Sequence, residues 1–461
     1  MLLNINQVTS RVFDYVVVGG GTTGLPLAVR LSEDPSVSVL VLEAGPSNLD
    51  DPNILTPAAF GSHFGKENYD WDFKTLPQKN CFDRSVPWNR GKGLGGSSAI
   101  NFFQFHRPAK SDIDAFEKLG NAGWNWDLLQ KYYLKTETFL EPTEKSECMR
   151  YNLADHGKNG PLAIAYPATL SNFEEPYQAA LQLLNIDLVK EPFSGNTNGT
   201  WITPVTIDPK NQVRSYAANK YYQPNESREN LFVLPLANVT KIITDKSADG
   251  NLTATAVEFI HDGSPSQVKV GKEVVISAGT IMSPRILELS GIGNPEILRK
   301  AGVEVRLELP GVGENLQEHL YAGVSHELRE DVLGDYLTFD RLRDPEELAR
   351  QKELYRKEGK GVYGMSVVCM TFVPLAKISP AYDKLQQSLK DLIQAKAASG
   401  AFSEGLLKQY EVQLQQIKNR EPSCEFVLSP RFTSKPDPPA PGKQYVTMSA
   451  LVNHPFSRGS I

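Results

Sequence analysis

Three glycines at the spacing G-x-G-x-x-G, Gly19, Gly21 and Gly24, are the residues near the start of the chain that could do chemistry. This spacing suits a diphosphate. Gly19 permits a tight turn, Gly21 lets the backbone approach the phosphates, and Gly24 lets a helix pack closely on a strand. The amides at the start of such a helix favour a bound anion. The stretch therefore predicts a dinucleotide site, and we include Thr22 and Thr23 among its contacts.

The flanking residues predict the elements that would position these glycines. A β-branched run at residues 13–18 indicates a strand buried on both faces, residues 22–32 a helix, and residues 37–42 a second apolar strand. Glu43 ends that second strand, where a carboxylate can accept a hydrogen bond from a ribose hydroxyl. This order indicates a βαβ unit that binds a dinucleotide, and it does not choose between FAD and NAD.

A second glycine-rich loop, at residues 89–108, combines backbone amides, hydroxyl groups and positive charge. Four glycines lie between Gly91 and Gly96, Ser97 follows them, and Arg90 precedes them. Such a loop suits a second contact with a diphosphate or with the polar edge of a flavin ring. A flexible surface loop is the alternative, but the apolar run that follows favours a buried position.

Composition narrows the class of protein. A chain of 461 residues favours two domains, and 40% apolar with 22% charged residues is typical of a globular protein. The net charge of −6 argues against nucleic acid or an anionic membrane as the main partner. Four widely spaced cysteines without a C-x-x-C pattern predict neither a metal site nor a disulfide framework. We recognise no signal peptide and no transmembrane run, so we expect an intracellular, cytoplasmic protein.

Two long stretches carry a family resemblance. Residues 91–101, with Phe105, Pro108 and Asp114 at their spacings, resemble the first sequence signature of the glucose–methanol–choline (GMC) oxidoreductases. Residues 279–293 resemble the second signature and predict a helix that opens at Ser283-Pro284. The resemblance implies an FAD-dependent oxidase or dehydrogenase that acts on a small-molecule alcohol, with oxygen or another electron acceptor.

The resemblance also implies a fold and a set of cofactor contacts. We expect an α/β protein (α+β overall), with a Rossmann-like FAD-binding domain at residues 11–155 and 211–320. A substrate domain with antiparallel sheet and helices would occupy residues 156–210 and 321–461. The expected contacts, which include a wall formed by Trp71 and the backbone of Val239 at the adenine, are Gly19, Gly21, Thr22, Thr23, Gly24, Glu43, Ala44, Trp71, Arg90, Gly95, Gly96, Ser97, Asn101, Phe102, Phe103, Gln104 and Val239.

The mode of FAD attachment follows from one position of the first signature. Some family members attach FAD covalently through a histidine in this loop, and Ile100 stands at the matching position here. We therefore expect non-covalent FAD.

The catalytic base is the part that the sequence does not supply. In the family, a neutral histidine takes the alcohol proton while hydride passes to flavin N5. That histidine lies in a C-terminal portion which follows a stretch like residues 453–459, and none of the seven histidines here matches its motif. We therefore assign no catalytic residue and expect a truncated chain.

Three alternatives remain open at this point. The chain is a truncated GMC oxidoreductase, a non-catalytic FAD-binding remnant, or an NAD-dependent Rossmann dehydrogenase, which the two signatures disfavour. Residues 101–105 favour an aryl- or aliphatic-alcohol substrate over choline. The sequence predicts neither the particular alcohol nor the oligomeric state.

Overall fold

The chain folds into two compact units, described by a computed structural model over residues 2, 4–434 and 437–461. The first unit contains Met1–Phe102, Arg214–Leu316 and Arg458–Ile461, and the second contains Phe103–Val213 and Gln317–Ser457. Both units combine sheets with helices, which confirms the expected α/β class.

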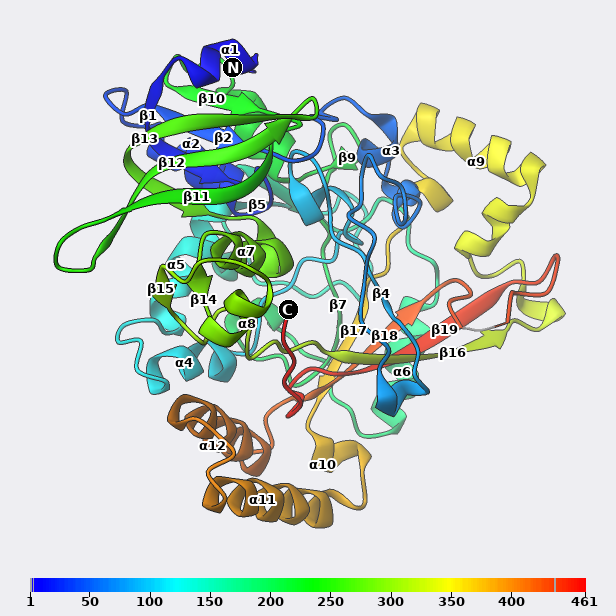
Figure 1. The fold of residues 1–461 in the computed structure, drawn as a ribbon. Helices are drawn as coiled ribbons and strands as arrows, with labels where there is room; N and C mark the ends of the chain where they lie inside the picture. The colour runs from blue at the N-terminus through cyan, green and yellow to red at the C-terminus, as the bar shows by residue number, and fades with distance from the viewer. Residues whose placement is uncertain (1, 3, 435–436) are drawn as a thin grey trace. The chain divides into compact units, whose positions relative to one another are not determined.

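The first unit is built on a mixed sheet in the order β10-β2-β1-β13-β12-β11. The first four strands run parallel, and β12 and β11 continue antiparallel. In Figure 1 the blue and green strands lie side by side although they are far apart in the sequence. Their bounds are β1 (Val12–Val18), β2 (Val39–Leu42), β10 (Leu231–Leu234), β11 (Asn238–Lys246), β12 (Leu252–His261) and β13 (Ser264–Ile276).

Helices cover both faces of this sheet, as the β-branched strands require. Val16 and Val18 of β1 pack in one core with Ile286 of α7, while Val17 packs in the other with Leu25 of α2. All five side chains are buried, so both faces of the second half of β1 are covered. The helices of this unit are α1 (Ile5–Thr9), α2 (Gly24–Leu31), α3 (Pro52–Leu55), α7 (Gly279–Leu289) and α8 (Pro295–Lys300).

The second unit has an antiparallel sheet in the order β16-β19-β18-β17-β7. Trp201 of β7 and Phe372 of β17 stack with ring centroids 5.4 Å apart and are buried in its core. The strands are β7 (Gly199–Ile202), β16 (Leu320–Glu327), β17 (Cys369–Val373), β18 (Cys424–Ser429) and β19 (Tyr445–Val452), and the helices are α4 (Lys110–Lys118), α5 (Trp126–Thr136), α6 (Glu174–Leu183), α9 (Pro345–Glu358), α10 (Leu375–Ile378), α11 (Tyr382–Ala398) and α12 (Glu404–Lys418).

Four two-stranded ladders accompany the two larger sheets in the described chain. They are β3 (Phe73–Lys74) with β4 (Pro87–Trp88), β5 (Glu137–Leu140) with β6 (Leu162–Ala165), β8 (Ile207–Asp208) with β9 (Val213–Arg214), and β14 (Ile292–Gly293) with β15 (Leu307–Glu308). Every helix in the described ranges is too short or too polar to cross a membrane.

The first boundary between the units differs from the predicted domain boundary. Residues 103–155 belong to the second unit, where β5 pairs with β6 and the buried Arg107 donates to the carbonyl of Phe193 at 3.0 Å. The assignment of FAD and substrate binding to particular residue ranges stays a prediction.

Helix α7 starts earlier than the sequence predicts. It begins at Gly279, directly after β13, and contains Pro284 in its interior. The expected start at Ser283-Pro284 is therefore wrong. Proline is tolerated in the first turn of a helix, which is why Pro284 suggested a helix start. Here β13 ends at Ile276 and the helix begins at Gly279, so Pro284 lies in the second turn.

Candidate functional site

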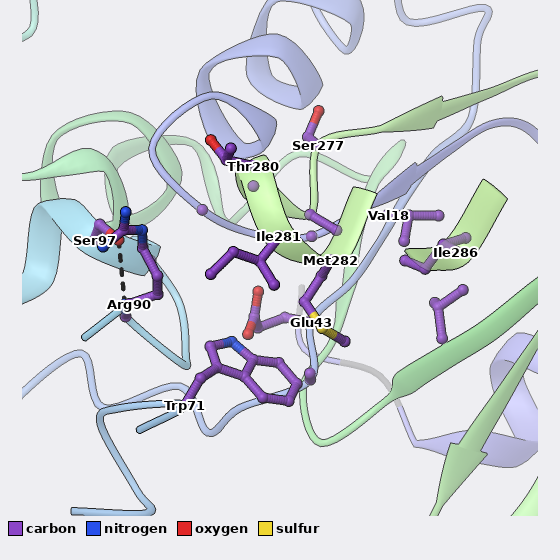
Figure 2. Close-up of a pocket in the computed structure, with 18 of the residues that line it drawn as sticks. Val18, Glu43, Trp71, Arg90, Ser97, Ser277, Thr280, Ile281, Met282 and Ile286 are labelled. Atoms are coloured by element: carbon purple, nitrogen blue, oxygen red, sulfur yellow. Dashed lines mark hydrogen bonds between the residues drawn. The ribbon is translucent and has the colours of Figure 1, made fainter. Parts of the chain in front are cut away.

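A cavity of about 230 Å³ lies in the first unit, at the carboxyl ends of its parallel strands. This is the edge at which open parallel sheets bind ligands, because the strands end there and the following loops diverge. Its walls come from the turn after β1, the end of β2, the loop that contains Arg90, and the starts of β11 and α7. Figure 2 shows side chains from these segments around one space.

Eleven of the predicted contacts line this cavity, although their positions in the sequence are widely separated. They are Gly19, Gly21, Thr22, Thr23, Glu43, Ala44, Trp71, Arg90, Gly96, Ser97 and Val239.

The three glycines of the first motif have distinct roles in the geometry. Gly19 adopts φ +99°, a conformation that favours glycine, in the turn after β1. A Cβ at Gly24 would lie 1.9 Å from the Gly19 carbonyl oxygen, so this position packs directly against the turn. A Cβ at Gly21 would meet nothing closer than the Cα of Gly96 at 3.8 Å. Gly21 itself lines the cavity.

The start of helix α2 forms part of the cavity wall. No side chain in the described part of the chain caps this helix, whose N-cap residue is Thr23. The helix dipole adds positive potential at this end, while within the first turn the Leu25 amide donates to the Gly21 carbonyl at 3.2 Å and Pro26 has no N–H. An anionic group such as a diphosphate fits this end of the cavity.

Glu43 is the buried acid of the site. Its Oε1 accepts the amides of Gly45 at 2.8 Å and Gly93 at 3.0 Å, and its Oε2 accepts the amide of Gly20 at 2.8 Å. Burial raises the pKa of Glu43 to about 6, although these amides act in the opposite direction. A carboxylate oxygen accepts two donors, so Oε2 retains capacity for a ribose hydroxyl.

The aromatic wall is held by a second buried acid. Asp70 accepts the amides of Gly65, Asp72 and Arg90 and the side-chain amide of Asn89. The Trp71 amide donates to the Arg90 carbonyl at 3.0 Å, so the backbone at Trp71 is held against the loop that contains Arg90. Burial alone would raise the pKa of Asp70, but these donors hold it below its usual value. The Lys92 ammonium lies 5.3 Å from the centre of the Trp71 indole.

The beginning of α7 is a part of the wall that the list of expected contacts missed. Ser277, Ala278, Gly279, Thr280, Ile281 and Met282 all line the cavity. In Figure 2 the side chains of Ile281 and Met282 reach toward the same space as Glu43 and Trp71. The sequence signal that could have found them is Gly279, which lies three residues after the apolar end of β13 at Ile276.

Six expected contacts do not line the cavity, and the structure gives each another environment. Gly24 packs on the turn that contains Gly19. At Gly95 the ring of Tyr216 occupies the space for a side chain, since a Cβ there would lie 2.5 Å from a ring carbon. Phe102 packs on Phe60, and the centroids of the two rings are 5.1 Å apart. The side chain of Asn101 accepts from Arg214, Phe103 is buried in the second unit, and the amide of Gln104 donates to the Val367 carbonyl at 3.0 Å.

Arg214 and Ser98 hold the loop that carries Gly96 and Ser97. The buried Arg214 donates to the side-chain oxygen of Asn101 at 2.6 Å, to the Ser98 carbonyl at 3.2 Å and to the Ile54 carbonyl at 3.0 Å. The Ser98 amide donates to the Thr22 hydroxyl at 3.2 Å, which joins the loop to the first motif. Neither Arg214 nor Ser98 is among the expected contacts.

Histidines do not line the cavity in the described residues. His63 is buried, with its Nε2 2.7 Å from the Asn53 carbonyl, and His454 lies 3.1 Å from the Asp112 carboxylate. His319 is half exposed and lies 3.7 Å from Glu318. These contacts are those of structural histidines, and we assign none of them to catalysis.

The sequence matches the family model of the GMC oxidoreductases over residues 13–321. Among the curated relatives, a dehydrogenase named mpl7 from Monascus purpureus is 36% identical over 428 residues. That match covers 91% of this chain and 68% of the relative.

Solved structures resemble the fold as a whole. An FAD-dependent oxidoreductase from Chaetomium thermophilum has a TM-score of 0.84 at 28% identity, over 97% of this chain and 75% of the other. A fungal aryl-alcohol oxidase has a TM-score of 0.81 at 26% identity, over 97% of this chain and 76% of the other.

Proposed function

Because this chain belongs to the GMC oxidoreductase family, we propose that it binds FAD non-covalently in the cavity of the first unit and oxidises an alcohol. The observation that carries the proposal is the meeting of the α2 N-terminus with the Glu43 carboxylate in one cavity. An anion-binding helix start beside a buried hydroxyl acceptor fits the diphosphate and ribose of a dinucleotide.

The residues of the chain would divide the cofactor between them. The amides near Gly21 and Thr22, with Ser97 and the positive charge of Arg90, would hold the diphosphate. Oε2 of Glu43 would accept a ribose hydroxyl, and the backbone near Val239 would meet the adenine. Ile100 is buried and carries no nucleophile, which supports attachment without a covalent bond.

The chemistry would come from the cofactor once it is bound, since a flavin accepts hydride at N5. The chain would supply binding and orientation, and it would exclude water from the buried Glu43 end of the cavity. We assign the alcohol proton to no residue of the chain.

The substrate class is proposed from both the sequence and the structural resemblance. Residues 101–105 include three phenylalanines, and a fungal aryl-alcohol oxidase shares the fold. We therefore propose an aryl or aliphatic alcohol as substrate, with oxygen or another acceptor as oxidant.

Anaerobic reduction of the bound flavin tests this proposal. The purified chain, loaded with FAD, is mixed with benzyl alcohol, a short aliphatic alcohol and choline, and the visible absorption is followed. We expect the flavin bands to bleach with the first two alcohols. General-base catalysis is typically worth about 10²–10⁴-fold, so we expect the bleaching to be slow.

Two outcomes would contradict the proposal. Bound flavin that no alcohol bleaches, but that dithionite reduces, would support a non-catalytic FAD-binding protein. Fastest bleaching with choline would contradict the proposed substrate class. The control repeats the experiment with FMN, which lacks the adenosine half of FAD. It shows whether a flavin is reduced without being held at the dinucleotide site.

A further inference from the structure

The Glu43 carboxylate joins three backbone segments that form separate parts of the cavity wall. The amide of Gly20 comes from the turn after β1, that of Gly45 follows β2, and that of Gly93 comes from the loop between Gly91 and Gly96. Each of these segments contributes other residues to the lining of the cavity. One side chain therefore contacts all three segments at once.

The three segments approach one another so closely that side chains are excluded between them. A Cβ at Gly45 would lie 2.3 Å from the nitrogen of Gly93, and one at Gly93 would lie 2.8 Å from the carbonyl oxygen of Pro46. At Gly20, a Cβ would lie 2.9 Å from the side chain of Leu94. The backbones of the Gly45 and Gly93 segments are thus in direct contact beside the carboxylate, and the Gly95 amide donates to the Gly20 carbonyl at 2.8 Å.

The cost of burying the Glu43 carboxylate and the hydrogen bonds that offset this cost both indicate a structural role for the side chain. The residue is only 6% exposed, so its charge has lost most of its hydration. Hydrogen bonds from amides to a carboxylate are charge-assisted and stronger than those between neutral groups. The three amides therefore compensate a buried charge, and the charge in turn orders the three segments.

We propose that Glu43 is a positioning residue, whose carboxylate fixes the spacing of the three segments before any nucleotide binds. The inference rests on the proposed function in one respect, since the cavity that Glu43 shapes is taken to be the FAD site. It adds to the ribose contact a role that involves no ligand atom.

Hydrogen–deuterium exchange of the flavin-free chain tests this role directly. In the wild type we expect slow exchange at the amides of Gly20, Gly45 and Gly93. In Glu43→Gln, one carboxylate oxygen becomes an amide group that cannot accept. The other oxygen still accepts, so we expect exchange to become at least about tenfold faster at the amides that face the new amide group: Gly20 if it replaces Oε2, or Gly45 and Gly93 if it replaces Oε1. Asp51→Asn is the matched control: it alters another carboxylate of the same unit, one that accepts from Tyr69 and Asn53, and should leave the three glycines unchanged.

Nucleotide binding separates positioning from a ribose contact alone. We expect Glu43→Gln to weaken both ADP and 2′-deoxy-ADP, because the wall is displaced for both, and to weaken ADP more wherever the ribose contact is lost as well. A variant that weakens ADP only would overturn the proposal, as would fast exchange at these glycines in the wild type, a result that does not require the variant to fold. If the glycines behave as expected but FAD never binds, the proposed function fails and this inference stands.

Discussion

Replacing Gly21 by valine is expected to abolish the retention of FAD while leaving the chain folded. The protein itself has room at this position, where a Cβ would be 3.8 Å from its nearest neighbour, and no left-handed φ is required. The side chain would instead enter the space in which the backbone must approach the phosphates. We expect the affinity for FAD, measured by flavin fluorescence titration, to fall at least about a hundredfold, or about 2.7 kcal/mol.

Two other glycines provide controls for this prediction. Gly24→Ala should unfold the chain or lower its thermal midpoint strongly, because its Cβ would meet the Gly19 carbonyl at 1.9 Å. Gly311→Ala lies in open space in the same unit and should change neither stability nor affinity. If purified Gly21→Val retained stoichiometric FAD, the diphosphate of FAD would not lie against the backbone of Gly21, and the prediction would be wrong.

Replacing Arg214 by methionine is expected to cost both stability and cofactor affinity. Methionine keeps much of the volume but leaves the carbonyls of Ile54 and Ser98 and the side chain of Asn101 without their buried donor. Each buried acceptor that loses its donor costs about 1–3 kcal/mol, so we expect a loss of about 3 kcal/mol in the free energy of unfolding. FAD affinity should fall as well, because the loop that Arg214 holds carries Gly96 and Ser97 into the cavity.

Urea unfolding of the flavin-free chain and an FAD titration measure the two effects separately. Arg30→Met is the matched control, since Arg30 is an exposed arginine of the same unit that pairs with Glu33. An exposed ion pair contributes about 0–1 kcal/mol, so this variant should resemble the wild type. An Arg214→Met chain of wild-type stability would mean that the loop is held by other contacts.

The local part of the site follows from the sequence, because its determinants are close together in the chain. Gly19, Gly21, Gly24 and Glu43 lie within one βαβ unit, and strand, turn, helix and strand form as predicted. Spacing alone could assign a conformational role to each glycine, since the turn and the packing of the helix on the strand involve neighbouring segments.

Contacts between distant segments could not be predicted in the same way. The orientation of Asn101 depends on Arg214, 113 residues later in the chain. Asn101, a residue of the first signature, therefore accepts a hydrogen bond from Arg214 and does not line the cavity. The wall from Ser277 to Met282 exists because β13 pairs with β1, which brings the start of α7 to the end of the first strand. No periodicity near either segment encodes these pairings.

The most direct test of the central claim is a binding titration of the flavin-free chain with FAD, followed by displacement with ADP. The cavity binds the adenosine diphosphate half in this account, so we predict saturable binding of FAD that ADP reverses, and no competing binding by FMN. Binding of FMN with an affinity equal to that of FAD, or a failure of ADP to displace FAD, would contradict the claim that the α2 start and Glu43 form the dinucleotide site.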